Sequence, residues 1–141
     1  MNEAMNDLHR ALAQANTVLL TGPMDPDGDS IGACLALARA AETFSSATVH
    51  VAGELNYRYA WIPDAERVMT DDALADAYDL VVVMDGDRGR LTPRVTALFQ
   101  SAESTALVDH HQSSSADGYD VVLLDPTSPS TCEMVYRILS A

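Results

Sequence analysis

Two hydrophobic patterns alternate along the chain. Some segments carry apolar residues at every third or fourth position, which is the spacing of an amphipathic helix packed on a core. Between them lie short, almost wholly apolar runs, which are typical of strands buried on both faces of a parallel sheet. We therefore expect helices at 3–15, 30–44, 71–77, 93–102 and 130–141, and strands at 17–21, 47–52, 79–85, 105–109 and 119–124.

This alternation predicts an α/β fold. The sheet should be doubly wound, mainly parallel and five-stranded, with helices on both faces and right-handed crossovers. The segment 55–68 contains Trp61 and Pro63 and is expected to be a short packed stretch with a turn. Neither an internal repeat nor a low-complexity stretch divides the 141 residues, so we expect one domain over 1–141.

Charge and composition narrow the classes of function. The chain has 21 acidic and eight basic residues, for a net charge of −13, and every basic residue is Arg. Binding of long nucleic acid by charge requires clustered Lys or Arg, so we exclude it. Neither a membrane-spanning run nor a secretory signal is evident. We expect a cytoplasmic protein with no membrane contact, in which Cys34 and Cys132 are reduced thiols.

Residues able to bind a metal follow three of the expected strands. Pro26-Asp27-Gly28-Asp29 comes after the first strand, Asp85 ends the third, and Asp109-His110-His111 ends the fourth. The carboxyl ends of parallel strands lie at one edge of the sheet, where ligands bind. Carboxylates and imidazoles together suit Mn²⁺ or Mg²⁺. Such a site is typical of enzymes that hydrolyse phosphate esters.

Each of these clusters also has a simpler interpretation. Pro-Asp-Gly is a common turn sequence, and Asp85 could cap a turn or a helix. Arg88 and Arg90 could bind a substrate phosphate, or they could simply neutralise the neighbouring acids. Two successive histidines after a buried strand, flanked by an aspartate, are the hardest feature to explain structurally.

The motifs resemble those of the DHH phosphoesterases in order and spacing, over nearly the whole chain. The resemblance rests on Pro26-Asp27-Gly28-Asp29-Ser30-Ile31-Gly32, on Asp85, on Asp109-His110-His111 and on the segment from Asp125 to Glu133. The most similar subgroup contains nano-RNases, nucleotide phosphatases and cyclic-dinucleotide phosphodiesterases. The resemblance implies two Mn²⁺ ions, with Mg²⁺ as the alternative. It also implies hydrolysis of phosphate esters in short oligonucleotides or small nucleotides by a metal-activated water.

The resemblance also assigns roles to individual residues. Asp109 would orient a histidine, and His111 would contact the scissile phosphate or assist the leaving group. Arg88 and Arg90 remain the candidates for binding the substrate phosphate. The metal ligands would be Asp27 and Asp29, one for each ion, Asp85 as a bridge between both, and His110 on the second ion.

The sequence departs from the family pattern in three ways. Pro23 stands where the family has a metal-binding histidine, and Asp25 could replace it only with a shift of two residues. A fourth motif with a further Asp ligand, and a C-terminal substrate-binding domain, would lie beyond Ala141. We therefore expect a truncated DHH domain that completes its site with a missing C-terminal domain or as a homodimer.

Two further interpretations stay open. In the first, the chain is a degenerate DHH domain without turnover that binds a nucleotide or a metal, or acts in assembly or regulation. In the second and weaker one, the domain is purely structural and the acidic cluster is vestigial.

Overall fold

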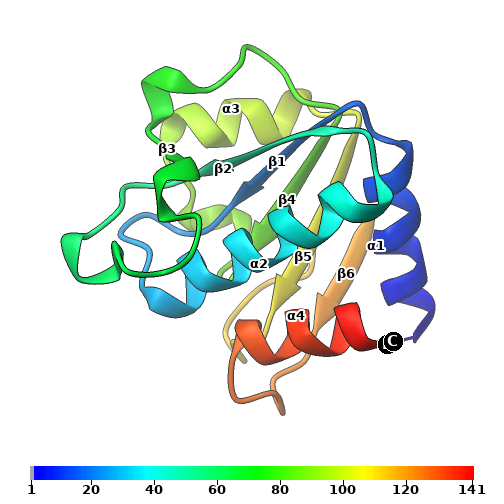
Figure 1. Ribbon diagram of the computed structural model, residues 1–141. Coiled ribbons are helices and arrows are strands. Elements are labelled where there is room, and N and C mark those ends of the chain that lie inside the picture. The colour runs from blue at the N-terminus through cyan, green and yellow to red at the C-terminus, as the bar shows by residue number, and fades with distance from the viewer. Residues whose placement is uncertain (1) are drawn as a thin grey trace.

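Six parallel strands form one sheet at the centre of the fold (Figure 1). The computed structural model describes residues 2–141. The strand order is β3-β2-β1-β4-β5-β6, and every neighbouring pair is parallel. The strands are β1 (Thr17–Thr21), β2 (Thr48–Ala52), β3 (Val68–Met69), β4 (Leu80–Met84), β5 (Ser104–Asp109) and β6 (Val121–Leu124).

Helices cover both faces of the sheet, because successive strand residues point to opposite sides. In β4, Leu80, Val82 and Met84 pack with α1, α2 and α4, whereas Val81 and Val83 pack with α3. This explains why β4 is apolar at every position. The helices are α1 (Asn2–Gln14), α2 (Gly28–Phe44), α3 (Pro93–Ser101) and α4 (Thr131–Ser140), with 3₁₀ turns η1 (Tyr57–Tyr59), η2 (Ala65–Arg67), η3 (Asp71–Ala73) and η4 (Arg88–Arg90).

The predicted α/β class, the parallel sheet and the helices on both faces are confirmed, but the count of five strands is wrong. The sixth strand, β3, has only two residues and lies next to β2, with Val51 opposite Val68 and Ala52 opposite Met69. Two residues are too few to show a period of two in the sequence. The strand therefore could not be separated from the packed segment before it.

The prediction of a helix at 71–77 is also wrong. Only the 3₁₀ turn η3 forms there, and Leu74 leaves it in an extended conformation (φ −70°, ψ 154°). Leu74 and Tyr78 pack into the core on the α3 face. These two residues are four positions apart, which is also the spacing of buried residues in a helix. A loop anchored at both residues therefore has the same sequence pattern as a short helix.

Side-chain caps fix where the helices begin. Asp27 accepts the backbone N–H of Ser30 and starts α2 two residues before the predicted boundary. Thr92 accepts the backbone N–H of Val95 at the start of α3, and Ser130 accepts the backbone N–H of Glu133 at the start of α4. None of the helices in the described part of the chain is long and apolar enough to cross a bilayer.

Candidate metal centre at the carboxyl edge of the sheet

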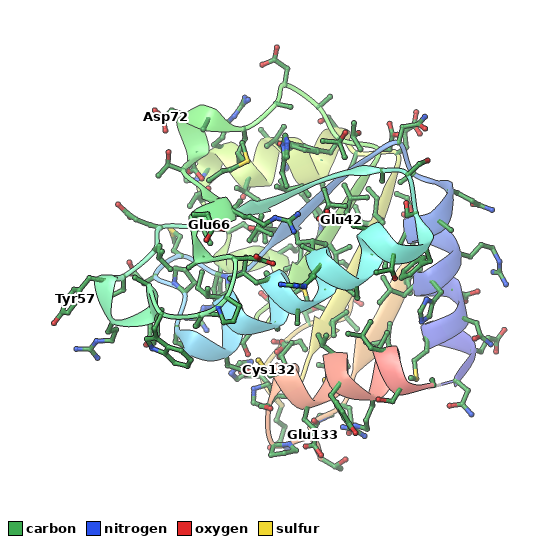
Figure 2. The ribbon with its side chains drawn as sticks, viewed as in Figure 1. Glu42, Tyr57, Glu66, Asp72, Cys132 and Glu133 are labelled. Carbon is green, nitrogen blue, oxygen red and sulfur yellow. The ribbon has the colours of Figure 1, made fainter. Side chains whose placement is uncertain are left out.

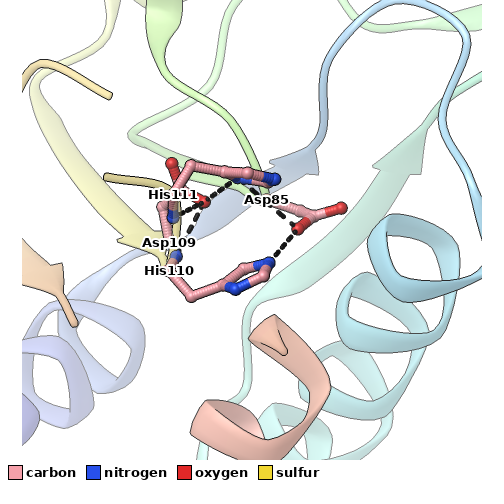
Figure 3. Close-up of side chains that lie close together, drawn as sticks. All are labelled: Asp85, Asp109, His110 and His111. Carbon is pink, nitrogen blue, oxygen red and sulfur yellow. Dashed lines mark hydrogen bonds and ion pairs between the residues drawn. The ribbon is translucent and has the colours of Figure 1, made fainter. Parts of the chain in front are cut away.

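The strand ends bring the predicted motifs together (Figure 3). Asp85, Asp109, His110 and His111 each offer an atom able to bind a metal, and these atoms lie within 4.8 Å of one another. Asp29 joins them from the first turn of α2, since His110 Nε2 lies 3.5 Å from Asp29 Oδ2 and 3.4 Å from Asp85 Oδ1. We call Asp29, Asp85 and His110 the acid–histidine cluster.

Asp85 is held in an unusual position at the end of β4. Its backbone is left-handed (φ 62°), which is uncommon for a residue other than glycine, and the residue is only 4% exposed. The backbone N–H donates to Val108 O at 3.0 Å, and the carboxylate accepts from Thr131 Oγ1 at 3.1 Å. A conformation of this kind costs about 1–3 kcal/mol and persists only when its surroundings enforce it. These contacts therefore fix the direction of the Asp85 carboxylate.

Asp29 lies against the N-terminus of α4. Its two carboxylate oxygens accept backbone N–H groups from Cys132 at 2.8 Å and from Thr131 at 3.0 Å. Burial raises the pKa of Asp29, but the hydrogen bonds from Cys132 and Thr131 outweigh it and hold this pKa below its usual value. The positive end of the helix also favours the ionised form. Asp29 is thus held in its ionised form beside Asp85 and His110.

The pKa of Asp85 is shifted in the opposite direction, upward. Burial, together with the neighbouring charges of Asp29 and Asp27, raises the pKa of Asp85 to about 8. The two acids therefore cannot both ionise at neutral pH without strong repulsion. A divalent cation between them would remove this repulsion. The charge of Asp27 also raises the pKa of Asp85, so Asp27 belongs to the same electrostatic environment. Its Oδ1 accepts the backbone N–H of Ser30 and caps α2.

His110 presents a free ring nitrogen to the acids. Its Nδ1 lies 3.2 Å from the backbone carbonyl of Ser128, which is a suitable acceptor for an Nδ1–H. With the hydrogen on Nδ1, the lone pair is on Nε2, which faces Asp29 and Asp85. Metal-binding histidines commonly use this arrangement, because the bond through one nitrogen orients the other. The chemistry of the acid–histidine cluster therefore fits one divalent cation.

Asp109 and His111 form a separate pair beside the cluster. Asp109 is completely buried, and its Oδ1 accepts the backbone N–H groups of His110 and His111 and lies 2.7 Å from His111 Nδ1. Ser114 Oγ donates to its other oxygen. Both carboxylate oxygens are therefore occupied by the chain itself. Asp109 is thus placed to orient the His111 ring, and the bond through Nδ1 leaves His111 Nε2 available.

Three other residues that the sequence singled out form no hydrogen bond or ion pair with the cluster in the described part of the chain. The guanidinium of Arg88 is held over the Phe99 ring, 5.9 Å from its centroid, and Arg90 is exposed, while its backbone carbonyl accepts Met24 N–H at 2.8 Å. Asp25 is exposed and left-handed (φ 55°), and no contact joins it to the acid–histidine cluster within the described residues. A phosphate-binding role for Arg88 and Arg90 stays a prediction.

Pro23 is buried and packs toward Gly86, the residue after Asp85. A Cβ placed on Gly86 would meet the Pro23 ring at 3.4 Å. The position that the family resemblance assigns to a histidine ligand is thus next to Asp85 in space, but it is filled by a side chain without a donor atom.

Sequence reasoning did not anticipate the contribution of α4. Thr131 and Cys132 lie 102 and 103 positions after Asp29, and Thr131 lies 46 after Asp85. The available signal in the sequence is Ser130 followed three residues later by Glu133, a spacing typical of a helix N-terminus. It did not indicate where that terminus would lie.

The raised pKa of Asp85 predicts a pH dependence in the metal-free protein. Folded Asp85 keeps its proton up to about pH 8, whereas the unfolded chain releases it near 3.8. The free energy of unfolding should therefore fall as pH rises through this window, by up to about 1.4 kcal/mol per pH unit. Urea unfolding in chelator at pH 5 and pH 8 measures the change. Asp85→Asn should remove it, and the exposed Asp117→Asn should not; an equal fall in Asp85→Asn would contradict the assignment.

Solved structures of two other proteins share this fold. An exopolyphosphatase-related protein from Bacteroides fragilis superposes with a TM-score of 0.86 at 18% identity, over 99% of this chain and 44% of that chain. The exonuclease RecJ bound to manganese gives a TM-score of 0.59 at 17% identity, over 97% and 35%. At these identities the likeness is one of fold, and this chain spans less than half the length of either protein.

Comparison with curated protein sequences gives no match. The family model for the DHH family, N-terminal domain, matches residues 17–141. That match includes every strand and all the residues of the acid–histidine cluster, so the chain belongs to the DHH family.

Proposed function

We propose that this chain hydrolyses phosphate esters in short oligonucleotides or small nucleotides with the help of divalent cations, Mn²⁺ first and Mg²⁺ as the alternative. The observation that carries this proposal is the convergence of Asp29, Asp85 and His110 beside the Asp109–His111 pair. Membership of the DHH family supports it. The manganese bound to RecJ supports the choice of metal.

The acid–histidine cluster would hold the cation through Asp29 Oδ2, Asp85 Oδ1 and His110 Nε2, with Asp27 beside it. A divalent cation supplies a more acidic water and neutralises charge on a phosphate. The chain contributes the orientation of these donors. Thr131 holds Asp85, the N–H groups of α4 hold Asp29, and Ser128 holds His110.

His111 is proposed to act on the leaving group. Hydrolysis of a phosphate ester leaves an alkoxide oxygen that needs a proton, and a positioned imidazole is a suitable general acid. Asp109 fixes the ring through Nδ1, so the proton would be transferred from Nε2.

Short substrates fit the charge of the chain. A net charge of −13 opposes binding of a long polyanion, and the eight arginines do not form a continuous stripe in the sequence. A mononucleotide or dinucleotide presents only one or two phosphates. We propose that its remaining contacts come from a second copy of the chain or from a further domain.

Replacing His111 tests this chemistry. His111→Gln should lower the kcat for hydrolysis of a 5′-phosphorylated dinucleotide by about 10²- to 10⁴-fold, because the general acid is lost. Mn²⁺ affinity should change little, since the ligand atoms remain. Asp109→Asn should produce a similar loss through misorientation of the ring, while His9→Gln on α1 serves as the control. A His111→Gln variant with full activity would contradict the proposal.

One observation favours a second function, in which the chain binds a cation or a nucleotide without turnover. Pro23 occupies the position of a family metal ligand and is buried beside Gly86. A site that lacks this ligand has fewer donors for a second ion. Two-ion phosphoesterases use both ions to stabilise the attacking and leaving oxygens.

Restoring the histidine separates the two functions. If the unaltered chain binds one Mn²⁺ without turnover, Pro23→His should raise the stoichiometry to two ions and produce measurable hydrolysis. Calorimetric titration and product analysis measure the two quantities. Pro126→His, at an exposed position, controls for the added imidazole. An unaltered chain that already binds two ions and turns over would rule out the non-catalytic function.

A further inference from the structure

The segment after β2 concentrates exposed aromatic rings. Tyr57, Tyr59 and Trp61 are three of the eight aromatic residues in the chain, and they fall within five positions. Tyr57 is 83% exposed and Trp61 is 77% exposed, and Figure 2 shows Tyr57 at the outer edge of the molecule. Large rings are usually buried because they carry so much apolar surface. Two of them exposed in one loop therefore form a candidate binding surface.

The loop that carries these rings is well defined. Asn56 caps η1 by accepting Arg58 N–H at 3.1 Å, and Ala60 N–H donates to Tyr57 O at 3.1 Å. Leu55 and Ile62, on either side, pack against the core beneath α2. The rings are thus presented by an anchored turn, and their exposure does not result from a frayed end.

This turn lies next to the metal centre. The ring of Tyr59 covers Gly28, where a Cβ would come within 3.2 Å of it, and Gly28 separates Asp27 from Asp29. A cavity of about 310 Å³ is lined by Asp27 together with Asn56, Arg58 and Tyr59. Pockets for small molecules begin at about 300 Å³. The cavity therefore connects a predicted metal ligand with the aromatic turn.

Arg58, on the same turn, provides a second observation that points to a ligand. Among the described residues five of the eight arginines form ion pairs, whereas Arg58, Arg88 and Arg90 form none. Arg58 forms none although the acids Asp25 and Glu54 line the same cavity. In a chain with a net charge of −13, an unpaired guanidinium beside this site is suited to an anion or to the face of a base.

We propose that the aromatic turn, residues 57–61, is a nucleobase platform. The base of a nucleotide would stack on Tyr57 and Trp61, Arg58 would contact its sugar–phosphate, and its phosphate would lie toward Asp27. Stacking is tolerant of sequence because every base has a π-face. This inference rests on the proposed function and deepens it, since it selects nucleotides over inorganic polyphosphate as the substrate class.

Trp61 is the only tryptophan, so it reports directly on the platform. In Mg²⁺, AMP should produce a saturable change in Trp61 fluorescence, and ribose 5-phosphate and tripolyphosphate should not. Calorimetry should show AMP binding weakened on the order of tenfold in Tyr57→Ala and in Trp61→Ala. Tyr136→Ala, an equally exposed ring on α4, should bind AMP normally. Equal affinity for AMP and ribose 5-phosphate, or normal affinity in both platform variants, would overturn the inference.

Two further outcomes separate this inference from the proposed function. In His111→Gln the AMP-induced fluorescence change should persist, so a platform that binds AMP in a chain without hydrolysis still supports the inference. A shift of Trp61 emission that depends on protein concentration, without any nucleotide, would show the rings covered by a second copy. That result would overturn the platform and leave the hydrolysis proposal intact.

Discussion

A buried carboxylate at the end of the central strand is the constraint on which the rest of the site depends. β4 pairs with β1 on one side and with β5 on the other, so Asp85 lies between the motifs that follow those strands. A buried charge is costly unless its neighbours compensate for it. Here burial and the charge of Asp29 keep the proton on Asp85 up to about pH 8, and Thr131 Oγ1 donates a hydrogen bond to its carboxyl group. Asp29 in turn accepts the backbone N–H of Thr131 at the N-terminus of α4. The position of α4 and the geometry of the site therefore depend on the same contacts.

The sheet could be predicted largely because its strands are buried on both faces. β4 is apolar at every position, and β1 and β5 each contain three successive apolar residues, which is typical of buried strands in an α/β fold. β3 and the region 71–77 could not be predicted, because two-residue pairing and an anchored loop leave no periodic signal. Tertiary contacts decide the structure in both places.

For the candidate site, the sequence predicts which residues converge but not how their side chains are oriented. The convergence of Asp29, Asp85 and His110 follows from parallel topology alone. Their orientation does not, since it depends on Ser128, Thr131 and Cys132, which reach the site only through the path of the chain between β6 and α4. The direction of the Arg88 side chain could not be predicted either. Its guanidinium lies over Phe99, and the place of Phe99 depends on how α3 packs on the sheet. Sequence identifies the donors, and packing determines what each donor faces.

The central claim is that Asp29, Asp85 and His110 hold a divalent cation. Calorimetric titration of the unaltered chain with Mn²⁺ at neutral pH tests it most directly. We expect saturable binding of at least one ion per chain, with release of protons because Asp85 ionises when the ion binds. The binding should disappear in Asp85→Ala. A chain that binds no Mn²⁺, or that binds it equally well without the Asp85 carboxylate, would contradict the account.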